Sequence, residues 1–368
     1  MSVRDLVKPH IRDLAPYKPG KPMEELEREL GITDSIKLAS NENPLGPSPK
    51  AVAAIREAAE QIHRYPDGAS FKLRAKLAAR IGVGEDQLVF GTGCDEVIEL
   101  IAKTFIGLGD EVVFPWPSFA MYPIVVTGMG GTSVRIPLNG DLDHDLDAMA
   151  DAVTDKTRAV MVCNPNNPTG VSFGAQAFER FVARLPDDVL LAVDEAYFEF
   201  VRRGDFPDAT ALLADRPATI VLRTFSKIYG IAGVRIGYGI TSPEVASYLE
   251  RARHPFNVNL LAEAAAVAAL DDDEHLEKTL ELNATGGDFL RDELEKLGIE
   301  TWPTDANFVL ARTGADVYDA LLKQGVIIRP MGGFGLDDFV RISIGLPEEN
   351  ARLIKAITEL RAAQGGAS

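Results

Sequence analysis

The sequence predicts an α/β protein, with a mostly parallel central sheet flanked by helices and a smaller α+β domain after it. Two observations predict this class. Between residues 88 and 222, short apolar runs without polar alternation, typical of strands buried on both faces, alternate with helical patterns. After about His254 the pattern changes to long helices followed by a few strands.

The elements divide the chain into three expected regions. Residues 1–47 are rich in proline and glycine and form an N-terminal arm with one short helix, expected to pack with the small domain and a partner subunit. Residues 48–254 form the large domain, which begins with a helix capped by Ser48 and a second helix over 70–80. Residues 255–368 form the small C-terminal domain.

The apolar and amphipathic runs locate the remaining elements. Strands are expected at 88–90, 112–114, 159–163, 189–193 and 219–222, and a helix at 97–106. In the C-terminal region, helices are expected at 259–270, 274–297 and about 347–362, with strands at 308–310, 326–328 and 340–342. The uncharged run 112–134 contains prolines and glycines, which predicts strand, loop and buried helix and argues against a membrane span.

Composition excludes several classes of protein. The 368 residues include 38 Lys+Arg and 55 Asp+Glu, a net charge of −17, which argues against nucleic-acid binding. The two cysteines, Cys94 and Cys163, suggest neither a disulfide framework nor a zinc site, and the five histidines are scattered, so no metal is expected. The charged N-terminus has no export signal, which favours a cytoplasmic location.

Polar motifs follow the expected strands, where functional groups of α/β sheets gather. After residues 88–90 come Gly91 to Glu96, which suit either a phosphate site at a helix N-terminus or a plain turn; Glu96 replaces the third glycine of a dinucleotide motif. Residues 164–170 are Asn-Pro-Asn-Asn-Pro-Thr-Gly, which by itself is a turn. Asp194 and Glu195 suit a catalytic or metal-binding pair or a helix cap.

Lys227 lies just past another apolar strand, in Arg-Thr-Phe-Ser-Lys. A lone lysine is most often a solvated surface charge. Among small residues next to a buried strand, however, burial and nearby cations lower an amine's pKa and leave it nucleophilic.

Asn-Pro-Thr-Gly, Asp-Glu-Ala-Tyr, Ser-Lys and Arg-x-Gly-Tyr occur in that order, ending at Tyr238. Over nearly the whole chain this arrangement resembles the class I and II aminotransferases, which are pyridoxal 5'-phosphate enzymes of fold type I. The resemblance implies that Lys227 forms the Schiff base and shuttles a proton. It implies that Asp194 pairs with the cofactor's ring nitrogen and keeps the ring an electron sink.

The resemblance also implies the other cofactor contacts. Asn167 and Tyr197 would bond the ring's 3' oxygen, and Phe119 would stack on the ring, its alternative being core packing. The phosphate would lie at the backbone N–H groups of Cys94 and Asp95, with further contacts from Thr224, Ser226 and Arg235. Cys94 stands where small residues are common and would leave a partly exposed thiol near the phosphate.

Three further stretches, 37–49, 64–67 and 254–259, look like the histidinol-phosphate aminotransferases. That resemblance implies a ping-pong transamination in histidine biosynthesis. The reaction interconverts L-histidinol phosphate plus 2-oxoglutarate and imidazole-acetol phosphate plus L-glutamate. It also implies a homodimer, in which Tyr65 reaches the cofactor phosphate of the neighbouring subunit. The alternatives are an aromatic amino-acid aminotransferase and a phosphorylated amino-acid decarboxylase on the same fold.

The substrate site must accept a carboxylate and a phosphate in turn, which suits arginine because its planar fork binds either anion. Arg341 matches the family's carboxylate-binding arginine, and Arg329 resembles a second arginine of that site. Tyr17, Asn43 and Asn307 occupy matching stretches and are candidates for the pocket lining. A regulatory protein on the same fold would be expected to add a basic DNA-binding segment, and none is seen.

Overall fold

The computed structural model describes residues 2–17 and 19–365 of the chain. Within them, the largest sheet has seven strands in the order β2-β8-β7-β6-β5-β3-β4. Every neighbouring pair is parallel except those of β8, which runs antiparallel to β2 and β7. The strands are β2 (Leu88–Gly91), β3 (Glu111–Trp116), β4 (Thr132–Pro137), β5 (Thr157–Cys163), β6 (Leu190–Asp194), β7 (Thr219–Thr224) and β8 (Gly237–Thr241). The predicted α/β class is confirmed.

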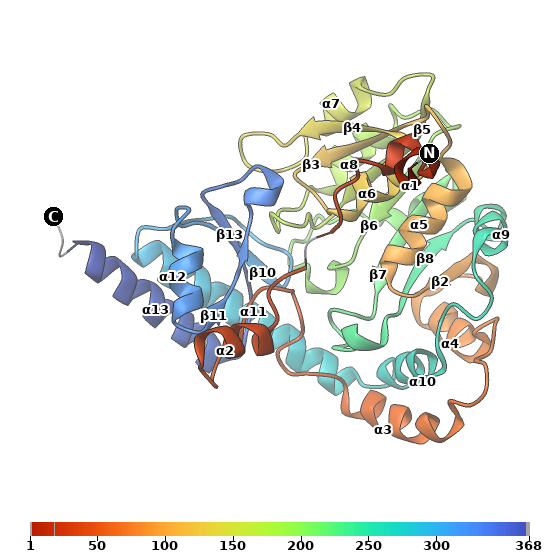
Figure 1. Ribbon diagram of the computed structural model, residues 1–368. Helices are drawn as coiled ribbons and strands as arrows, with labels where there is room; N and C mark the ends of the chain where they lie inside the picture. Colours follow the sequence, from red (N-terminus) through yellow and green to blue (C-terminus); the bar gives the residue numbers. More distant parts are fainter. Residues whose placement is uncertain (1, 18, 366–368) are drawn as a thin grey trace.

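Helices cover both faces of this sheet (Figure 1). Alternate strand residues enter two separate apolar clusters, which is why the strand runs lack polar alternation. One face packs against α5 (Cys94–Phe105), α6 (Met121–Gly128) and α9 (Pro243–Ala252). The other face packs against α3 (Pro49–Ala58), α4 (Phe71–Ile81), α7 (Leu146–Asp151), α8 (Ala175–Val182) and α10 (Leu260–Ala269).

A second sheet lies in the C-terminal region, with the order β12-β13-β10-β9 and antiparallel pairing throughout. Its strands are β9 (Glu300–Thr301), β10 (Phe308–Arg312), β12 (Arg329–Pro330) and β13 (Phe339–Ser343). The helices there are α11 (Asp273–Lys296), α12 (Val317–Lys323) and α13 (Pro347–Gly365). Residues of this sheet, α11, α12 and α13 share a third apolar cluster.

The N-terminal arm contains α1 (Val3–Leu6), α2 (Met23–Leu30) and β1 (Ile36–Lys37). Strand β1 pairs in parallel with β11 (Val326–Ile327), so the arm's end is part of the C-terminal region's structure. The described residues of the arm therefore contain two α-helices where one was expected. The expected arm and C-terminal domain include residues 1, 18 and 366–368, which lie outside the described residues.

The strands expected at 88–90, 112–114, 159–163, 189–193 and 219–222 are confirmed as β2, β3, β5, β6 and β7. Two strands of the seven-stranded sheet were missed. β8 contains two glycines in Gly-Tyr-Gly-Ile-Thr and so lacks an apolar run, and β4 is a partly exposed edge strand. Helix α5 begins at Cys94 rather than at residue 97, because Gly93 takes the cap position with a φ of 80°.

The uncharged run at 112–134 forms β3, α6 and the start of β4, so the expected strand and buried helix are confirmed. No helix in the described part of the chain is both long and apolar enough to cross a membrane.

Candidate active site

A cavity of about 340 Å³ opens at the carboxyl ends of the parallel strands, where the arm and the C-terminal sheet meet the large sheet. Strands β3 and β5 are neighbours in the sheet. The chain continues from β3 to β4 on one side of this pair and from β5 to β6 on the other side, so the strand order reverses between β3 and β5. Such a reversal opens a crevice for ligands. The lining comprises Tyr17, Gly20, Ala39, Ser40, Asn41, Glu42, Cys94, Asp95, Phe119, Met121, Cys163, Asn167, Asp194, Ala196, Tyr197, Thr224, Ser226, Lys227, Ala232, Arg235, Arg329 and Arg341.

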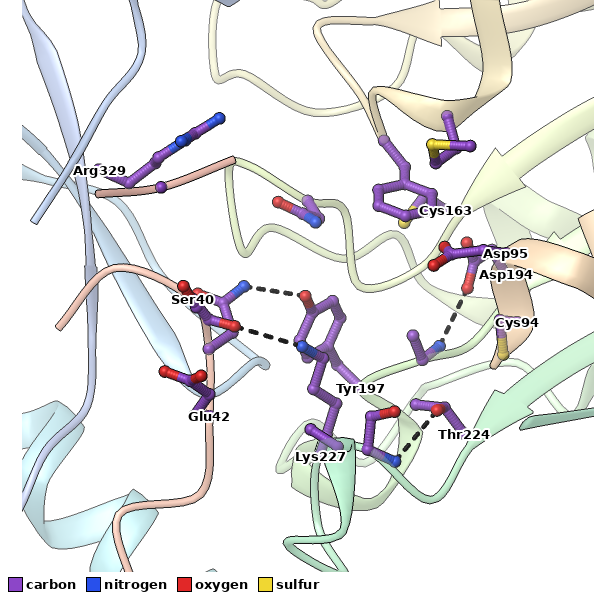
Figure 2. Close-up of a pocket in the computed structure, with 18 of the residues that line it drawn as sticks. Ser40, Glu42, Cys94, Asp95, Cys163, Asp194, Tyr197, Thr224, Lys227 and Arg329 are labelled. Carbon is purple, nitrogen blue, oxygen red and sulfur yellow. Dashed lines mark hydrogen bonds between the residues drawn. The ribbon is translucent and has the colours of Figure 1, made fainter. Parts of the chain in front are cut away.

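Lys227 lies in the loop that follows β7 and projects its amine into the middle of the cavity (Figure 2). Its Nζ makes a long hydrogen bond of 3.5 Å to the carbonyl oxygen of Ser40 and lies 5.8 Å from the centre of the Tyr197 ring. Burial, reinforced by the charge of Arg341, lowers the pKa of Lys227 to about 8. The side chain therefore has a substantial fraction of neutral amine near neutral pH.

Asp194 is the last residue of β6 and is only 4% exposed. The hydroxyl of Tyr122 donates to its Oδ2 at 2.9 Å, and the backbone N–H of Ala196 donates to its Oδ1 at 3.2 Å. Burial raises the pKa of Asp194 to about 6, although both hydrogen bonds oppose the shift. A cationic group in the cavity would stabilise this buried carboxylate.

One end of the cavity is built for an anion. Helix α5 points its N-terminus there, so the N–H groups of its first turn face the lining, and Thr224 and Ser226 supply hydroxyls. Arg235 adds a guanidinium that bonds Asp95 Oδ2 at 3.0 Å. The strand behind approaches closely: a Cβ on Gly237 would lie 2.5 Å from the nitrogen of Cys94. This end suits a phosphate group.

The opposite end of the cavity contains two arginines. Arg329 and Arg341 are register partners on the paired strands β12 and β13. Arg341 donates to Asn167 Oδ1 at 2.6 Å and to the carbonyl of Ala39 at 2.8 Å, and its buried Nε has no hydrogen-bond partner among the described residues. Burial lowers the pKa of Arg341. The guanidinium of Arg329 lies 6.0 Å from the centre of the Tyr17 ring.

Asn41 of the arm is hydrogen-bonded both to Tyr197, which follows β6 of the large sheet, and to Ser343 on β13 of the C-terminal sheet. Its Nδ2 donates to the hydroxyl of Tyr197 at 2.9 Å (Figure 2), and its Oδ1 accepts from Ser343 Oγ at 3.0 Å. Asn307 Nδ2 donates to the Asn41 carbonyl at 3.0 Å. Burial raises the pKa of Tyr197, so this phenol is a neutral hydrogen-bonding group.

Three predicted residues lie outside the lining. Tyr65 is 81% exposed and stacks on Phe256 with ring centres 4.8 Å apart, away from the cavity of its own chain. Asn43 donates instead to the carbonyl oxygen of Ile228 and to the hydroxyl of Thr279. Asn307 donates to the backbone carbonyl of Asn41 in the arm. The other predicted site residues are all brought together.

The thiol of Cys94 differs from the partly exposed group expected. The residue is 8% exposed, and its Sγ donates to the carbonyl of Arg223 at 3.0 Å. Burial raises the pKa of Cys94 well above its ordinary value, so the thiol stays protonated. No group of three or more metal-ligating side chains occurs in residues 2–17 and 19–365.

The family model for aminotransferase class I and II matches residues 33–357 of this sequence. The chain belongs to this family. Among similar curated proteins of this aminotransferase family is the histidinol-phosphate aminotransferase of Moorella thermoacetica, 48% identical over 96% of this chain and 92% of that protein. Histidinol-phosphate aminotransferase 2 of Pseudomonas aeruginosa is 47% identical over 97% of this chain and 98% of its own.

Solved structures agree with the aminotransferase fold. The histidinol-phosphate aminotransferase of Sinorhizobium meliloti, in complex with pyridoxal 5'-phosphate, superposes with a TM-score of 0.88 at 31% identity, over 96% of this chain and 98% of that one. Thermus thermophilus aspartate aminotransferase with maleate shares the fold, with a TM-score of 0.81 at 23% identity, over 96% of this chain and 98% of that one.

The sequence analysis missed several polar residues of this aminotransferase site, among them Tyr122, Asn41, Ser40 and Glu42. Tyr122, three residues after Phe119, is the hydroxyl donor to Asp194. Asn41 was passed over in favour of Asn43 in the same Asn-Glu-Asn stretch. The available signal was a polar stretch in the arm, but which asparagine faces the cavity depends on the arm's pairing with the C-terminal region.

Proposed function

We propose that this aminotransferase transfers an amino group between L-histidinol phosphate and 2-oxoglutarate, giving imidazole-acetol phosphate and L-glutamate. The observation that carries the proposal is similarity over nearly the full length to relatives of that name, at 48% and 47% identity. The cavity supports it, because a lysine amine lies between an anion site at one end and two arginines at the other.

Pyridoxal 5'-phosphate is the proposed cofactor, and the cavity fits it. Its phosphate matches the first turn of α5 together with Thr224, Ser226 and Arg235, and its protonated ring nitrogen would satisfy the buried Asp194. We further propose that Phe119 contacts the ring and that Asn167 and Tyr197 bond its 3' oxygen. When bound, the cofactor supplies an electron sink for charge that develops at the substrate's Cα.

Lys227 is proposed to move the proton. Its amine takes a proton from the Cα of the amino donor in the first half-reaction and delivers a proton to the Cα of the amino acceptor in the second. The amine must therefore be neutral in one step and charged in the next. A pKa of about 8 suits both roles near neutral pH. Asp194 stays ionised once a cation lies beside it and fixes where positive charge is held.

Arg341 and Arg329 are proposed to bind the substrate's anionic end. L-Glutamate presents a carboxylate where histidinol phosphate carries a phosphate, and paired guanidinium groups accept either. Their register pairing on β12 and β13 places both at the same end of the cavity. Tyr17, next to Arg329, is proposed to line this end, and Asn307 to act through Asn41.

A homodimer is proposed, with Tyr65 reaching the cofactor phosphate of the neighbouring subunit. Exposed apolar side chains around Tyr65 support an interface: Ile62 is 67% exposed and Phe256 44%. We also propose a cytoplasmic location and a division of the chain into regions at residues 47 and 254. Helix α10 follows residue 254 but packs on α3 in the large sheet's cluster.

The test is a single-turnover titration of the purified holoenzyme with L-glutamate, histidinol phosphate, phenylalanine and phosphothreonine, following the cofactor's absorbance. We expect conversion by L-glutamate, and conversion by histidinol phosphate far more efficiently than by phenylalanine. A preference for phenylalanine would move the enzyme to the aromatic aminotransferases. Carbon dioxide release from phosphothreonine would indicate the decarboxylase alternative.

A further inference from the structure

The two arginines lie on one β-hairpin. Strand β12 runs into the 3₁₀ turn Gly332–Phe334 and returns as β13, with Arg329 opposite Arg341. The loop is closed by a hydrogen bond of 3.0 Å from the Met331 nitrogen to the Phe339 carbonyl. Exposed glycines flank Phe334 on both sides, and the partly buried Phe334 and Leu336 of this loop pack against a small apolar cluster of Trp302, Leu310, Met331 and Phe339.

The tip of the hairpin contacts the large sheet. Phe334 stacks on Trp116, the last residue of β3, with ring centres 5.7 Å apart and planes inclined by 28°. The guanidinium of Arg135 on β4 lies 4.7 Å from the centre of the same Trp116 ring. Trp116 leads directly into the loop that places Phe119 in the cavity. In Figure 1 the loop between β12 and β13 extends toward the end of β3.

The strands that carry the two arginines are paired differently. Arg341 is 8% exposed, lies on a strand paired on both sides, and bonds Asn167 and Ala39. Arg329 lies on β12, which has two residues and is the edge strand of its sheet, so β13 is its only strand partner in the described part of the chain. Short edge strands fray easily. The stack of Phe334 on Trp116 lies just after the C-terminal end of β12 and therefore restrains that end of the strand.

We propose that Phe334 is a positioning residue for Arg329: by stacking on Trp116 it anchors the hairpin across the cavity's rim and aims Arg329 at the substrate's anionic group. This inference rests on the proposed function, because it takes Arg329 to bind that anion. Neither Phe334 nor Trp116 lines the cavity, so loss of their stack is expected to weaken anion binding and to leave Lys227 and Asp194 in place.

The test compares Phe334→Ala with wild-type holoenzyme in the half-reactions with L-glutamate and histidinol phosphate. The apparent Kd for both substrates is expected to rise about three- to tenfold, the range for losing one aromatic stack. The saturating rate should stay within about twofold, since only substrate binding is affected. The preference for histidinol phosphate over histidinol, which lacks the phosphate, should fall with it. A purely structural role would not change that preference.

Three further variants sharpen the test. Phe334→Tyr keeps the ring and should restore wild-type affinity. Trp116→Leu should repeat the loss, and combining it with Phe334→Ala should add little, because both remove one contact. Phe289→Ala on α11 is the matched control, since it truncates a phenylalanine that is 39% exposed, and it should behave as wild type.

A readout without turnover separates this inference from the proposed function. Trp116 and Trp302 are the two tryptophans of the sequence, and both pack with residues of the hairpin, so tryptophan fluorescence reports the hairpin without a background substitution. Titration of the holoenzyme with succinate, which has no amino group, should give a weaker affinity in Phe334→Ala. Equal succinate affinity, or unchanged Kd values, overturns the role of Phe334. A wild-type enzyme that does not transaminate histidinol phosphate overturns the proposed substrate instead.

Discussion

The cavity's two central titratable residues have their pKa values shifted toward each other. Burial lowers the pKa of Lys227 to about 8 and raises that of Asp194 to about 6, because low-dielectric surroundings disfavour both charged forms. Each side chain therefore costs stability in the protein without ligands, and a bound group with the complementary charge removes that cost. Perturbed pairs of this kind are typical of sites where protons move.

Replacing Lys227 should stabilise the cofactor-free protein. The folded-state pKa lies below the unfolded value of 10.5, so the unfolded chain binds the proton more tightly and the charged lysine opposes folding. Lys227→Met is expected to raise the free energy of unfolding by about 1–3 kcal/mol at pH 7. The gain should be complete below pH 8 and disappear as the pH rises toward 10.5.

Urea denaturation of the apo-protein at pH 7 and pH 10 measures this difference. Lys278→Met is the control, because the Lys278 side chain is 63% exposed on α11. The same Lys227→Met protein should lose multiple-turnover transamination by at least about a thousandfold. A variant less stable than wild type at pH 7 would contradict the pKa shift.

At the element scale, the anion site depends on how closely β8 approaches the start of α5. A Cβ on Gly237 would lie 2.5 Å from the nitrogen of Cys94 and 2.8 Å from the carbonyl carbon of Gly93. Both are backbone atoms, which cannot move aside as a side-chain end can. The glycine is therefore required where the strand passes behind the helix N-terminus.

Gly237→Ala should weaken cofactor binding by displacing the first turn of α5. We expect the Kd for pyridoxal 5'-phosphate to rise about tenfold or more, which corresponds to losing roughly one charge-assisted hydrogen bond. Gly239→Ala is the matched control on the same strand, since its Cβ would meet the flexible end of Ile220 at 2.7 Å. That control should reduce the melting temperature and leave the Kd near wild type; equal Kd changes in both variants would argue against the helix N-terminus.

The strands that were predicted contain continuous apolar runs in the sequence, and the strand β8, which was missed, does not. Strands β5, β6 and β7 are continuous apolar runs buried on both faces, and such runs need no information from the rest of the chain. β8 has no such run, because its glycines are required by neighbouring elements rather than by its own strand. The early start of α5 likewise depends on the backbone of Gly93.

At the scale of the whole molecule, Tyr65 is proposed to act across the interface between two subunits. It is exposed on its own chain and lies away from the cavity, so a role at the cofactor requires a second subunit. The exposed aromatic and aliphatic side chains around it give such a subunit an apolar surface to cover.

Mixing two inactive variants tests this arrangement. Tyr65→Ala and Lys227→Ala protomers, refolded together in equal amounts, should recover about a quarter of the wild-type activity, since half of the dimers carry one intact site. Refolding each variant alone is the control and should give little activity. If the mixture gives no more activity than the sum of the two variants alone, Tyr65 does not act across an interface.

The sequence by itself determined the fold class, most of the sheet and the residues that follow its strands. Burial of whole strands and the placement of polar groups at their carboxyl ends are local patterns, which marked Asp194, Asn167 and Lys227 by position, whereas the resemblance to the aminotransferases implied their roles. Tertiary structure alone decided that Asn41 rather than Asn43 faces the cavity and that Tyr122 bonds Asp194. It also decided that Phe334 meets Trp116. These contacts join residues far apart in the chain, and their geometry depends on strand register and packing, which no local pattern encodes.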